Sequence, residues 1–525
     1  MKRYLLNHWQ HSLLSLLLVF VVVNNMIWFS MGGSPLHWDD SIHLSESLEA
    51  NRILVASSIP LKYMIHFTLD YPPFVSWSAI PFYILLGEGL LASSITMSTF
   101  LVVLLLSTYG LGRRLFDESV GLLSALFVSA FPIVIDFSRQ FMLDMPLAAM
   151  TALSLYLLVR TREFNILGWS LLLGIALGCG LLTKWTFSFF LIYPTLFSGG
   201  MIFLKGTDKA RRIRNFSLCI LAACALSLPW YSAHFVSFLI SRSHSLVQGN
   251  RSIGGTILYY VQVLPEQTSW LMIPPLAVGI GLYVRKYNLQ HLIPILSLVG
   301  GYILLTMVIL KVPRFAIPLL PPFTVLACAG IVGWSMEYEH LKAVRIKSIL
   351  VFCAVIVLQY LAITYVTRDS HIGSIVSRQA FSSPIIPVQG GKERNWQQAG
   401  ILRAIACDST RPGSGRRSLQ VVPEHIFFNW ATFEYIVMLN RLPVTILPIF
   451  RSSQKSDFTV VKTGDLGEDA ANRQQITNAI LSDTLNYEFL QSFVLPDSSK
   501  AILMRQRVRI AKGDAGIQSK SHDHS

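Results

Sequence analysis

The chain has 525 residues, of which 52% are hydrophobic and only 14% are charged. Soluble globular proteins carry about 25% charged residues, so this composition excludes an ordinary soluble enzyme and a disordered chain. Six cysteines are too few and too scattered for a disulfide scaffold. The net charge of +14 would indicate nucleic-acid binding in a soluble protein. Here much of the Lys and Arg lies in short loops between apolar runs, which is typical of a polytopic membrane protein.

A bilayer-spanning helix needs about 20 mostly apolar residues. The chain contains eleven such runs, at 12–32, 91–111, 119–137, 142–159, 166–182, 185–204, 215–235, 268–284, 291–310, 315–334 and 347–366. A twelfth run, Pro73–Leu86, is short and contains Pro73 and Pro81. We interpret it as juxtamembrane, because the basic loops then gather on one side, which the positive-inside rule assigns to the cytoplasm. This topology predicts a cytoplasmic N-terminus, with the loop 33–90 and the chain after Arg368 outside.

The last part of the chain has a different composition. After Arg368 it is polar, and two short apolar runs, Leu419–Val422 and Val444–Leu447, flank a stretch with helical spacing at His425–Leu439. Strand, helix and strand in this order predict a small α/β domain. We therefore expect a transmembrane domain at 1–367 that includes the first external loop at 33–90. An extracytoplasmic α/β domain at 368–510 and a polar tail at 511–525 follow it.

Two acidic motifs fall on the external side of this topology. His37-Trp38-Asp39-Asp40 directly follows the first apolar run. It is either an interfacial Trp anchor with solvated carboxylates or a general base held near the membrane surface. Asp144 lies in the turn that starts at Arg139, just before Met145-Pro146. Asp144 either starts the next helix, with Arg139 as a surface partner, or belongs to a functional site.

Two basic motifs fall on the same side. Lys184 is the only charge between two apolar runs, and Lys311-Val312-Pro313-Arg314-Phe315 is another minimal loop. Such cations can be snorkelling interfacial anchors. Because they lie against the positive-inside bias, they can also bind an anion, with Arg pairing a phosphate in bidentate fashion and Lys acting as a point charge.

Carboxylates and cations at an external interface suit a lipid-linked phosphate donor better than a nucleotide sugar, which is a cytoplasmic metabolite. Glycosyl transfer from a phosphate needs one carboxylate that takes the proton of the acceptor hydroxyl and cations that stabilise the departing phosphate. One base acting opposite the leaving group predicts inversion. The sequence has no Gly-rich nucleotide loop, no zinc-type Cys/His spacing and no nucleophile elbow. We expect no cofactor and no bound metal, although a divalent metal stays possible.

In this order and spacing, five motifs resemble those of membrane glycosyltransferases of the GT-C class. The resemblance covers roughly residues 10–370. It is to the bacterial relatives of dolichyl-phosphate-mannose protein mannosyltransferases (glycosyltransferase family 39) and to the lipid A aminoarabinose transferases. The motifs are Trp38-Asp39-Asp40, Tyr71-Pro72-Pro73-Phe74, Arg139 to Pro146, Thr183-Lys184-Trp185, and Val312-Pro313-Arg314-Phe315 with Pro318 and Pro321.

The resemblance implies roles for individual residues. Asp39 matches the catalytic base, Asp40 its supporting acid, and Asp144 an acid that positions acceptor or base. Arg314 matches an Arg near the donor phosphate, and Lys184 a Lys that is frequently present. We expect the phosphate to be bound by Arg314, Lys184, Arg139, Lys62 and Tyr71.

The chain departs from the family pattern at two positions. Asp40 replaces the usual Glu, and Tyr71 stands where relatives carry His or Lys. If that side chain normally touches the phosphate, its charge must come from Lys62, Lys184 or Arg314. Tyr71 also argues against the aminoarabinose subfamily, which has Lys there.

These observations predict an all-α polytopic membrane protein of GT-C type with about 11 to 13 transmembrane helices and a C-terminal extracytoplasmic α/β domain. The expected function is transfer of a sugar from a polyprenyl-phosphate donor to an extracytoplasmic protein, lipid or glycan acceptor, at the inner (plasma) membrane. We expect membrane lipid, donor and acceptor as partners, and no nucleic acid. One alternative is a transporter or flippase of lipid-linked sugars, which would need polar groups near the bilayer midplane. Another is a membrane scaffold without catalysis.

Overall fold

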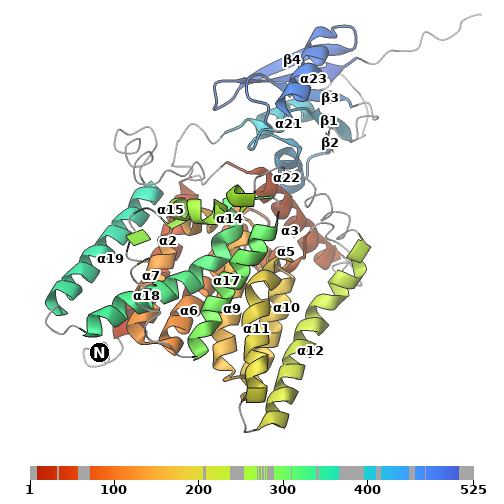
Figure 1. Ribbon diagram of the computed structural model, residues 1–525. Coiled ribbons are helices and arrows are strands. Elements are labelled where there is room, and N and C mark those ends of the chain that lie inside the picture. Colours follow the sequence, from red (N-terminus) through yellow and green to blue (C-terminus); the bar gives the residue numbers. More distant parts are fainter. Residues whose placement is uncertain are drawn as a thin grey trace, which may run out of the picture. The chain divides into compact units, whose positions relative to one another are not determined.

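A computed structural model shows the fold of the chain (Figure 1). It divides into two compact units: a helical unit of Met1–Ser34 with Ile42–Arg394, and a second unit of Pro35–Ser41 with Asn395–Ser525. The structure describes residues 9–31, 35–56, 71–204, 208–236, 253–268, 270, 273–274, 277, 280, 289–308, 310–337, 342–365, 395–408, 416–448, 456–467 and 469–507.

In its described residues the helical unit is built from α-helices and short 3₁₀ segments. In chain order the helices of its first half are α2 (Trp9–Ser30), α3 (Trp38–Ala56), α5 (Phe74–Leu86), α6 (Leu90–Leu115), α7 (Glu118–Ser129), α8 (Pro132–Phe137), α9 (Asp144–Arg160), α10 (Leu167–Leu181) and α11 (Phe187–Leu204). There follow α12 (Lys209–Ala233), α14 (Ile253–Gln262), α15 (Leu264–Thr268), η2 (Leu289–His291), α17 (Leu292–Met307), η3 (Pro313–Leu319), α18 (Leu320–Glu337) and α19 (Lys342–Tyr365).

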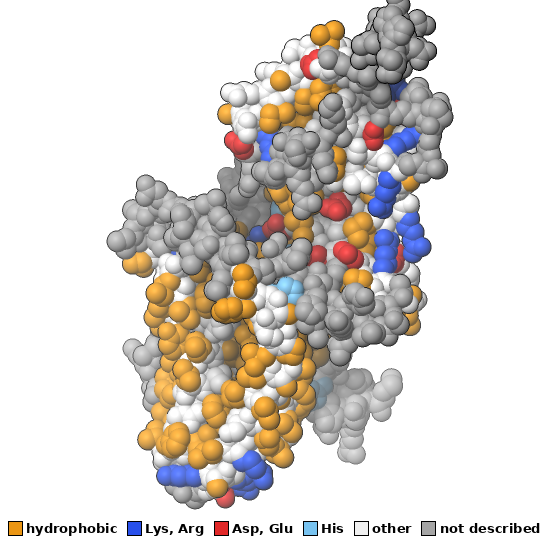
Figure 2. Space-filling model, turned by 90° about the vertical axis from the view of Figure 1, so that its right-hand side faces the viewer, with side chains coloured by type: hydrophobic (Ala, Val, Ile, Leu, Met, Phe, Trp, Pro, Cys, Tyr) orange, Lys and Arg blue, Asp and Glu red, His pale blue; other side chains and the backbone are white. Residues whose placement is uncertain are grey.

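Helix α9 lies at the centre of this unit. It packs against α6, α10, α11 and η3, and nearly all of its residues are buried. A helix that is apolar all round belongs inside a bundle. The helices around it leave large apolar side chains exposed, among them Leu221 on α12 and Leu16 on α2. Figure 2 shows one face of the molecule, on which hydrophobic side chains cover the helices and Lys and Arg gather at their end. This is the surface that a lipid bilayer requires.

Six helices in the described part of the chain are long and apolar enough to cross a membrane. They are Trp9–Ser30, Leu90–Leu115, Phe187–Leu204, Lys209–Ala233, Leu289–Met307 and Pro313–Val332. Shorter apolar helices add to them, including α5, α7 and α10. The chain is therefore a multi-pass membrane protein, while the larger count of 11 to 13 stays a prediction.

One expected span differs from the structure. The run 119–137 is two helices, since α7 ends at Ser129 and α8 begins at Pro132. Proline lacks the amide hydrogen that would continue α7, but it fits the first turn of a new helix. Most of the predicted span 268–284 lies outside the described residues.

The second unit contains a five-stranded sheet in the order β2-β1-β3-β5-β4. Strands β1 (Arg417–Val421), β2 (Val444–Pro448) and β3 (Phe458–Lys462) are parallel, with Leu419 of β1 opposite Ile446 and Phe458. Strands β4 (Tyr487–Val494) and β5 (Lys500–Gln506) complete the sheet in antiparallel fashion. Its helices are α21 (Gln398–Ala406), α22 (Trp430–Asn440) and α23 (Ala470–Ser482).

The order β1, α22, β2 is the strand, helix and strand predicted from the sequence. Asn429 starts α22 with a capping box: its side chain accepts from the amide of Thr432, whose hydroxyl accepts from the amide of Asn429. This cap places the helix start five residues later than the predicted stretch from His425. The predicted boundary at 367/368 lies within residues 366–394, which are outside the described residues.

Candidate active site

Asp144, Lys184 and Arg314 meet in the helical unit, although they are far apart in the sequence. The Lys184 Nζ donates to the Asp144 Oδ1 over 2.8 Å, and the Arg314 Nε lies 3.6 Å from the Asp144 Oδ2. Asp144 is 1% exposed and Lys184 6% exposed. A buried carboxylate with a cation on each oxygen is a strongly constrained arrangement. Three of the residues predicted for the site are thus brought together.

The turn between α10 and α11 holds Lys184 in place. The amide of Lys184 donates to the Gly180 carbonyl, and the Lys184 carbonyl accepts from the amide of Phe187. A Cβ on Gly180 would lie 2.3 Å from the Phe187 ring, so only glycine allows this ring to pack there. The Lys184 Nζ also lies 4.7 Å from the centre of the Phe315 ring. The ammonium group is therefore fixed by backbone, carboxylate and ring together.

The loop that carries Arg314 is fixed by its neighbours. The Lys311 Nζ donates to the carbonyls of Leu305 and Thr306, both over 2.8 Å, and also to that of Val308. These are the carbonyls at the C-terminal end of α17, where a cation is favourable. The Gln267 side chain donates to the Pro313 carbonyl over 2.6 Å. Lys311, one of the two loop cations expected to suit a phosphate, thus closes a helix end.

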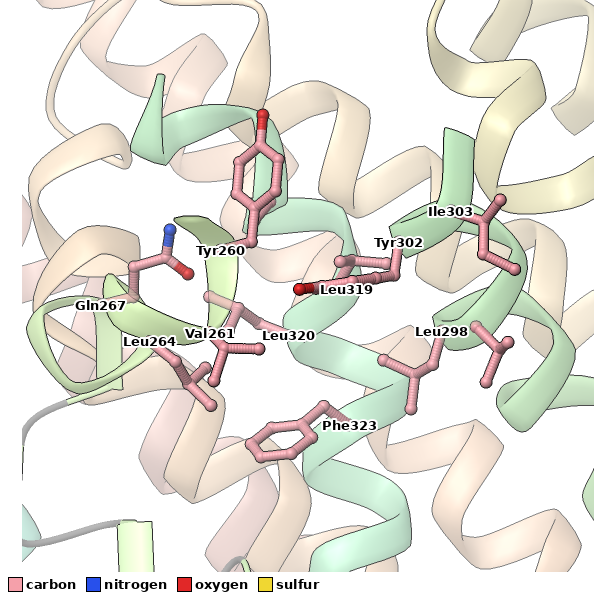
Figure 3. Close-up of a pocket in the computed structure, with 12 residues that line it drawn as sticks. Tyr260, Val261, Leu264, Gln267, Leu298, Tyr302, Ile303, Leu319, Leu320 and Phe323 are labelled. Carbon is pink, nitrogen blue, oxygen red and sulfur yellow. The ribbon is translucent and has the colours of Figure 1, made fainter. Parts of the chain in front are cut away.

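An apolar cavity of about 320 Å³ adjoins this loop (Figure 3). Ala316 and Leu319 of η3 form part of its wall, and Gln267 lies at one side with its amide bound to Pro313. The other lining side chains, labelled in Figure 3, include Tyr260, Leu264, Leu298, Tyr302 and Phe323. A cation-bearing loop thus lies directly beside an apolar cavity.

Asp39 and Asp40 belong to the second unit. They form the first turn of α3, where carboxylates are favoured by the helix dipole. Asp40 is 8% exposed, and Asp39 is partly buried. The amide of Asp39 donates to the His37 Nδ1 over 3.3 Å. The sequence does not predict that this segment, Pro35–Ser41, joins the C-terminal domain.

Contacts with the segment His425–Trp430 hold Asp39 and Asp40 in that unit. The amide of Trp38 donates to the Ile426 carbonyl over 3.1 Å. The Trp38 ring meets that of Trp430 edge to face at 6.4 Å, and the His37 ring meets that of Phe427 at the same distance.

The segment His425–Trp430 is itself rigidly built. The Asn429 side chain donates to the carbonyls of His425 and Ile426 over 2.9 and 3.2 Å. The Gln398 side chain donates to the Phe427 carbonyl over 2.7 Å. The acidic pair is therefore attached to a preorganised piece of the C-terminal domain.

Arg139 is bound in a different cluster. Its Nε donates to the Asn25 Oδ1 over 3.0 Å, its Nη2 donates to the Thr364 Oγ1 over 2.8 Å, and its guanidinium lies 4.8 Å from the centre of the Trp28 ring. These contacts join α2 and α19 to the segment before α9. The predicted role of Arg139 at the donor phosphate stays a prediction, and its contacts indicate a structural role.

Tyr71 and Lys62 are the two remaining residues predicted for the phosphate site. The Tyr71 ring packs edge to face on His43 at 5.4 Å, and the His43 Nδ1 lies 3.2 Å from the Glu46 Oε2. Lys62 lies outside the described residues. Among the described residues, no three His, Cys, Asp or Glu side chains lie together as a metal site would require.

Asp136 is a residue that the sequence analysis missed. It is 5% exposed and accepts from the Gln140 side chain over 2.8 Å, while its Oδ2 has no hydrogen-bond partner among the described residues. The signal was present, since Asp136 is the single charge in the apolar run Phe131–Phe137 and charge there is expensive. In the sequence Asp136 falls inside the predicted span 119–137, which hides this signal.

Comparison with known proteins agrees with this picture. The family profile of dolichyl-phosphate-mannose-protein mannosyltransferases matches residues 70–234. The fold is similar to that of ArnT from Cupriavidus metallidurans bound to undecaprenyl phosphate, with a TM-score of 0.59 and 14% identity over 96% of this chain and 99% of that chain. The resemblance predicted from the sequence is confirmed.

A second fold match is more distant. The oligosaccharyltransferase AglB from Archaeoglobus fulgidus, in complex with an inhibitory peptide and a dolichol-phosphate, has a TM-score of 0.56 and 10% identity over 84% of this chain and 64% of that chain. No curated protein matches the chain in sequence. At these identities the structural matches establish the GT-C fold and nothing about individual site residues.

Proposed function

We propose that this protein is a membrane glycosyltransferase that moves a sugar from a polyprenyl monophosphate to an extracytoplasmic acceptor, which is a protein, a lipid or a glycan. The observation that carries the proposal is the convergence of Lys184 and Arg314 on Asp144 beside an apolar cavity. An amphiphilic donor needs cations for its phosphate and an apolar cavity for its lipid. The solved relatives bound to undecaprenyl phosphate and dolichol-phosphate support the donor class.

In the proposed reaction the acceptor oxygen attacks the anomeric carbon of the donor sugar. The bond between that carbon and the phosphate oxygen breaks, and the polyprenyl phosphate leaves with the electron pair. Asp39, at the motif position after the first helix, takes the proton of the acceptor hydroxyl. The result is one bond formed, one bond broken and an inverted anomeric centre.

Lys184 and Arg314 stabilise the charge that grows on the leaving phosphate. Asp144 keeps both cations at fixed positions before the donor binds, so little reorganisation is needed during the reaction. Arg314 is the more available of the two cations, because 22% of its side chain is exposed against 8% for Lys184. We therefore assign the main phosphate contact to Arg314 and the supporting charge to Lys184.

The apolar cavity gives the donor's lipid a place next to the charged loop. Its volume of about 320 Å³ accommodates the first isoprene units of a polyprenyl chain. The rest of the chain would lie in the bilayer along the exposed apolar helices. In this proposal the phosphate lies beside Arg314, at the charged loop that adjoins the cavity.

We further propose that the C-terminal domain positions Asp39 and Asp40. The amide of Trp38 is bound by the Ile426 carbonyl, and the Trp38 ring contacts Trp430. A base that must meet an acceptor hydroxyl within hydrogen-bond reach benefits from such a fixed support. In the predicted topology the Asp39 segment and the Asp144 cluster are each on the outside of the plasma membrane, and the N-terminus is in the cytoplasm.

A transfer assay distinguishes a glycosyltransferase from the alternative function, a flippase of lipid-linked sugars. The protein is reconstituted into vesicles with radiolabelled polyprenyl-phosphate sugars and native membrane extract as acceptor source. Transfer of label to an acceptor supports the proposal and names the donor. Movement of labelled donor across the vesicle membrane, without transfer, would contradict it and establish the flippase.

A further inference from the structure

The helical unit also holds a basic cavity, distinct from the apolar one, that the proposed reaction does not use. It has a volume of about 530 Å³ and lies between α6 and α9. Three guanidinium groups line it: Arg113 and Arg114 from the end of α6, and Arg160 from the end of α9. We propose that this cavity binds the phosphate group of an anionic phospholipid.

The position of the cavity follows from α9 itself. This helix has 17 residues, beginning at Asp144 and ending at Arg160. At 1.5 Å per residue the two ends are about 25 Å apart, close to the roughly 30 Å thickness of the hydrocarbon core. The cavity therefore lies at the membrane interface opposite the Asp144 cluster, where it can only serve a different ligand.

The walls of the cavity are built to hold the arginines. The Arg160 guanidinium lies 4.1 Å from the centre of the Trp169 ring and donates to the Tyr156 hydroxyl over 3.4 Å. A Cβ on Gly110 would lie 2.7 Å from the Tyr156 ring, so glycine at this position lets that ring pack against α6. A stacked guanidinium is preorganised to pair with a phosphate in bidentate fashion.

One carboxylate lies at the edge of this cluster. The Glu118 Oε1 is 3.4 Å from the Arg113 Nε and accepts from the Tyr109 hydroxyl over 3.1 Å. The His11 Nε2 lies 3.7 Å from the same oxygen. Glu118 offsets one of the three arginine charges, so the cavity keeps an excess of two positive charges for an anion.

The apolar part of the cavity walls favours a phospholipid over free phosphate as the ligand. Leu106 and Leu153 line the cavity, and Leu106 is 44% exposed on the outer surface of α6. Acyl chains can therefore leave the cavity along the bundle surface while the phosphate stays among the arginines. Basic pockets between transmembrane helices bind anionic headgroups in this manner.

The test compares two double variants of the full-length protein. Arg114→Gln with Arg160→Gln removes two cavity charges and leaves the Arg113–Glu118 pair intact. Arg211→Gln with Arg214→Gln is the matched control, because both side chains are exposed and outside the cavity. They lie at the same end of the bundle, since the neighbouring Arg212 donates to the carbonyls of Arg162 and Glu163, just after α9.

Retention of phosphatidylglycerol and phosphatidylcholine is measured by native mass spectrometry. Wild type and control should retain phosphatidylglycerol preferentially, and the cavity variant should lose about tenfold or more of that preference. Equal retention by all three proteins, or an equal loss in the control, would overturn the proposal. Displacement of the lipid by inorganic phosphate at equal concentration would overturn the lipid assignment.

A conservative pair keeps the test decisive if the glutamine pair fails to fold. Arg114→Lys with Arg160→Lys preserves the charge but removes the bidentate fork. A folded lysine pair with weakened phosphatidylglycerol retention supports the proposal, and one with unchanged retention contradicts it. None of these arginines belongs to the proposed transfer site, so failure of this proposal leaves the transfer reaction untouched.

Discussion

The two acidic motifs differ in their surroundings. Asp144 is buried in the helical unit, and both of its oxygens face cations from distant loops. Asp39 and Asp40 lie in a first helical turn that the C-terminal domain holds through Trp38. A carboxylate already bound to an ammonium and a guanidinium is poorly placed to accept a further proton. We propose that Asp39 takes the proton and that Asp144 organises the two cations that bind the phosphate.

Asp39→Asn should have the largest effect on transfer, because the amide keeps the shape of the side chain but cannot take the proton. We expect kcat to fall about 10²- to 10⁴-fold, with a smaller fall for the neighbouring Asp40→Asn. Steady-state rates with the donor found in the transfer assay measure both. Similar losses in the two variants would remove the distinction between base and supporting acid.

Asp144→Ala should damage the fold as well as the activity, since it leaves Lys184 buried without its carboxylate. Loss of one partner of a buried pair costs about 3–5 kcal/mol of stability. The double variant Asp144→Leu with Lys184→Met should recover much of that stability, yet remain inactive. Thermal unfolding in detergent and the transfer assay report the two properties separately, and an active double variant would exclude this cluster from the reaction.

Arg314→Gln should weaken donor binding more than it weakens the fold, because this side chain is partly exposed. A hydrogen bond to a charged group contributes about 1.5–3 kcal/mol, so KM for the lipid donor should rise about 10- to 100-fold. The KM of Arg314→Lys should lie between that of Arg314→Gln and that of the wild type. An unchanged KM in both variants would place the donor phosphate elsewhere.

Trp430→Ala tests whether the C-terminal domain positions the acidic pair. We expect kcat to fall about tenfold or more while KM for the donor stays constant, because small displacements of a reacting group are costly. Trp430→Phe should restore most of the rate. Phe489→Ala is the control, since this residue of the same domain is 59% exposed. Equal rates for Trp430→Ala and the control would show that the contact does not matter for catalysis.

The pKa shifts of His425 and Asp497 predict that the C-terminal domain is less stable against unfolding at acid pH. Burial, aided by Lys462, lowers the pKa of His425 below its ordinary 6.5. Burial would raise the pKa of Asp497, but hydrogen bonds from Lys462 and Ser499 outweigh it and lower that pKa. Both groups bind fewer protons in the folded state than in the unfolded state. Their stabilisation is therefore present above the unfolded-state pKa values and is lost as pH falls through the folded ones.

Hydrogen exchange of the β3 amides in the full-length protein measures this effect, after correction for intrinsic rates. Protection should fall modestly between about pH 7 and pH 5 through His425, and further at lower pH through Asp497. In the variant His425→Phe the phenyl ring can still stack on Trp396 but does not titrate. The fall in protection between about pH 7 and pH 5 should therefore disappear in this variant. Protection in wild type that is constant with pH would contradict the prediction.

Much of this site could be predicted from the sequence, because charge is rare in apolar runs. Asp144, Lys184 and Arg314 each stand out as charges at the ends of apolar segments, and the structure brings them together. Asp136 did not stand out, since Pro132 divides a run that reads as one span. The strand, helix and strand of the C-terminal domain were also visible in the alternation of apolar runs.

The remaining features depend on contacts between distant segments. Nothing in the sequence near Trp38 reveals that its amide meets the Ile426 carbonyl almost 400 residues later. Arg139 resembles a partner for Asp144 in sequence, yet Asn25 and Thr364 bind it in the fold. Lys311 resembles a phosphate ligand until the carbonyls at the end of α17 are seen around its ammonium group. Local pattern identifies charged groups, but tertiary packing chooses their partners.

The stereochemistry of transfer tests the central claim most directly. The reconstituted protein is given a polyprenyl-phosphate sugar of known anomeric configuration, and the linkage of the product is determined by nuclear magnetic resonance. A single displacement with Asp39 as base predicts the opposite configuration in the product. A product that retains the donor configuration would be incompatible with a single displacement, and would contradict the roles proposed for Asp39 and Asp144.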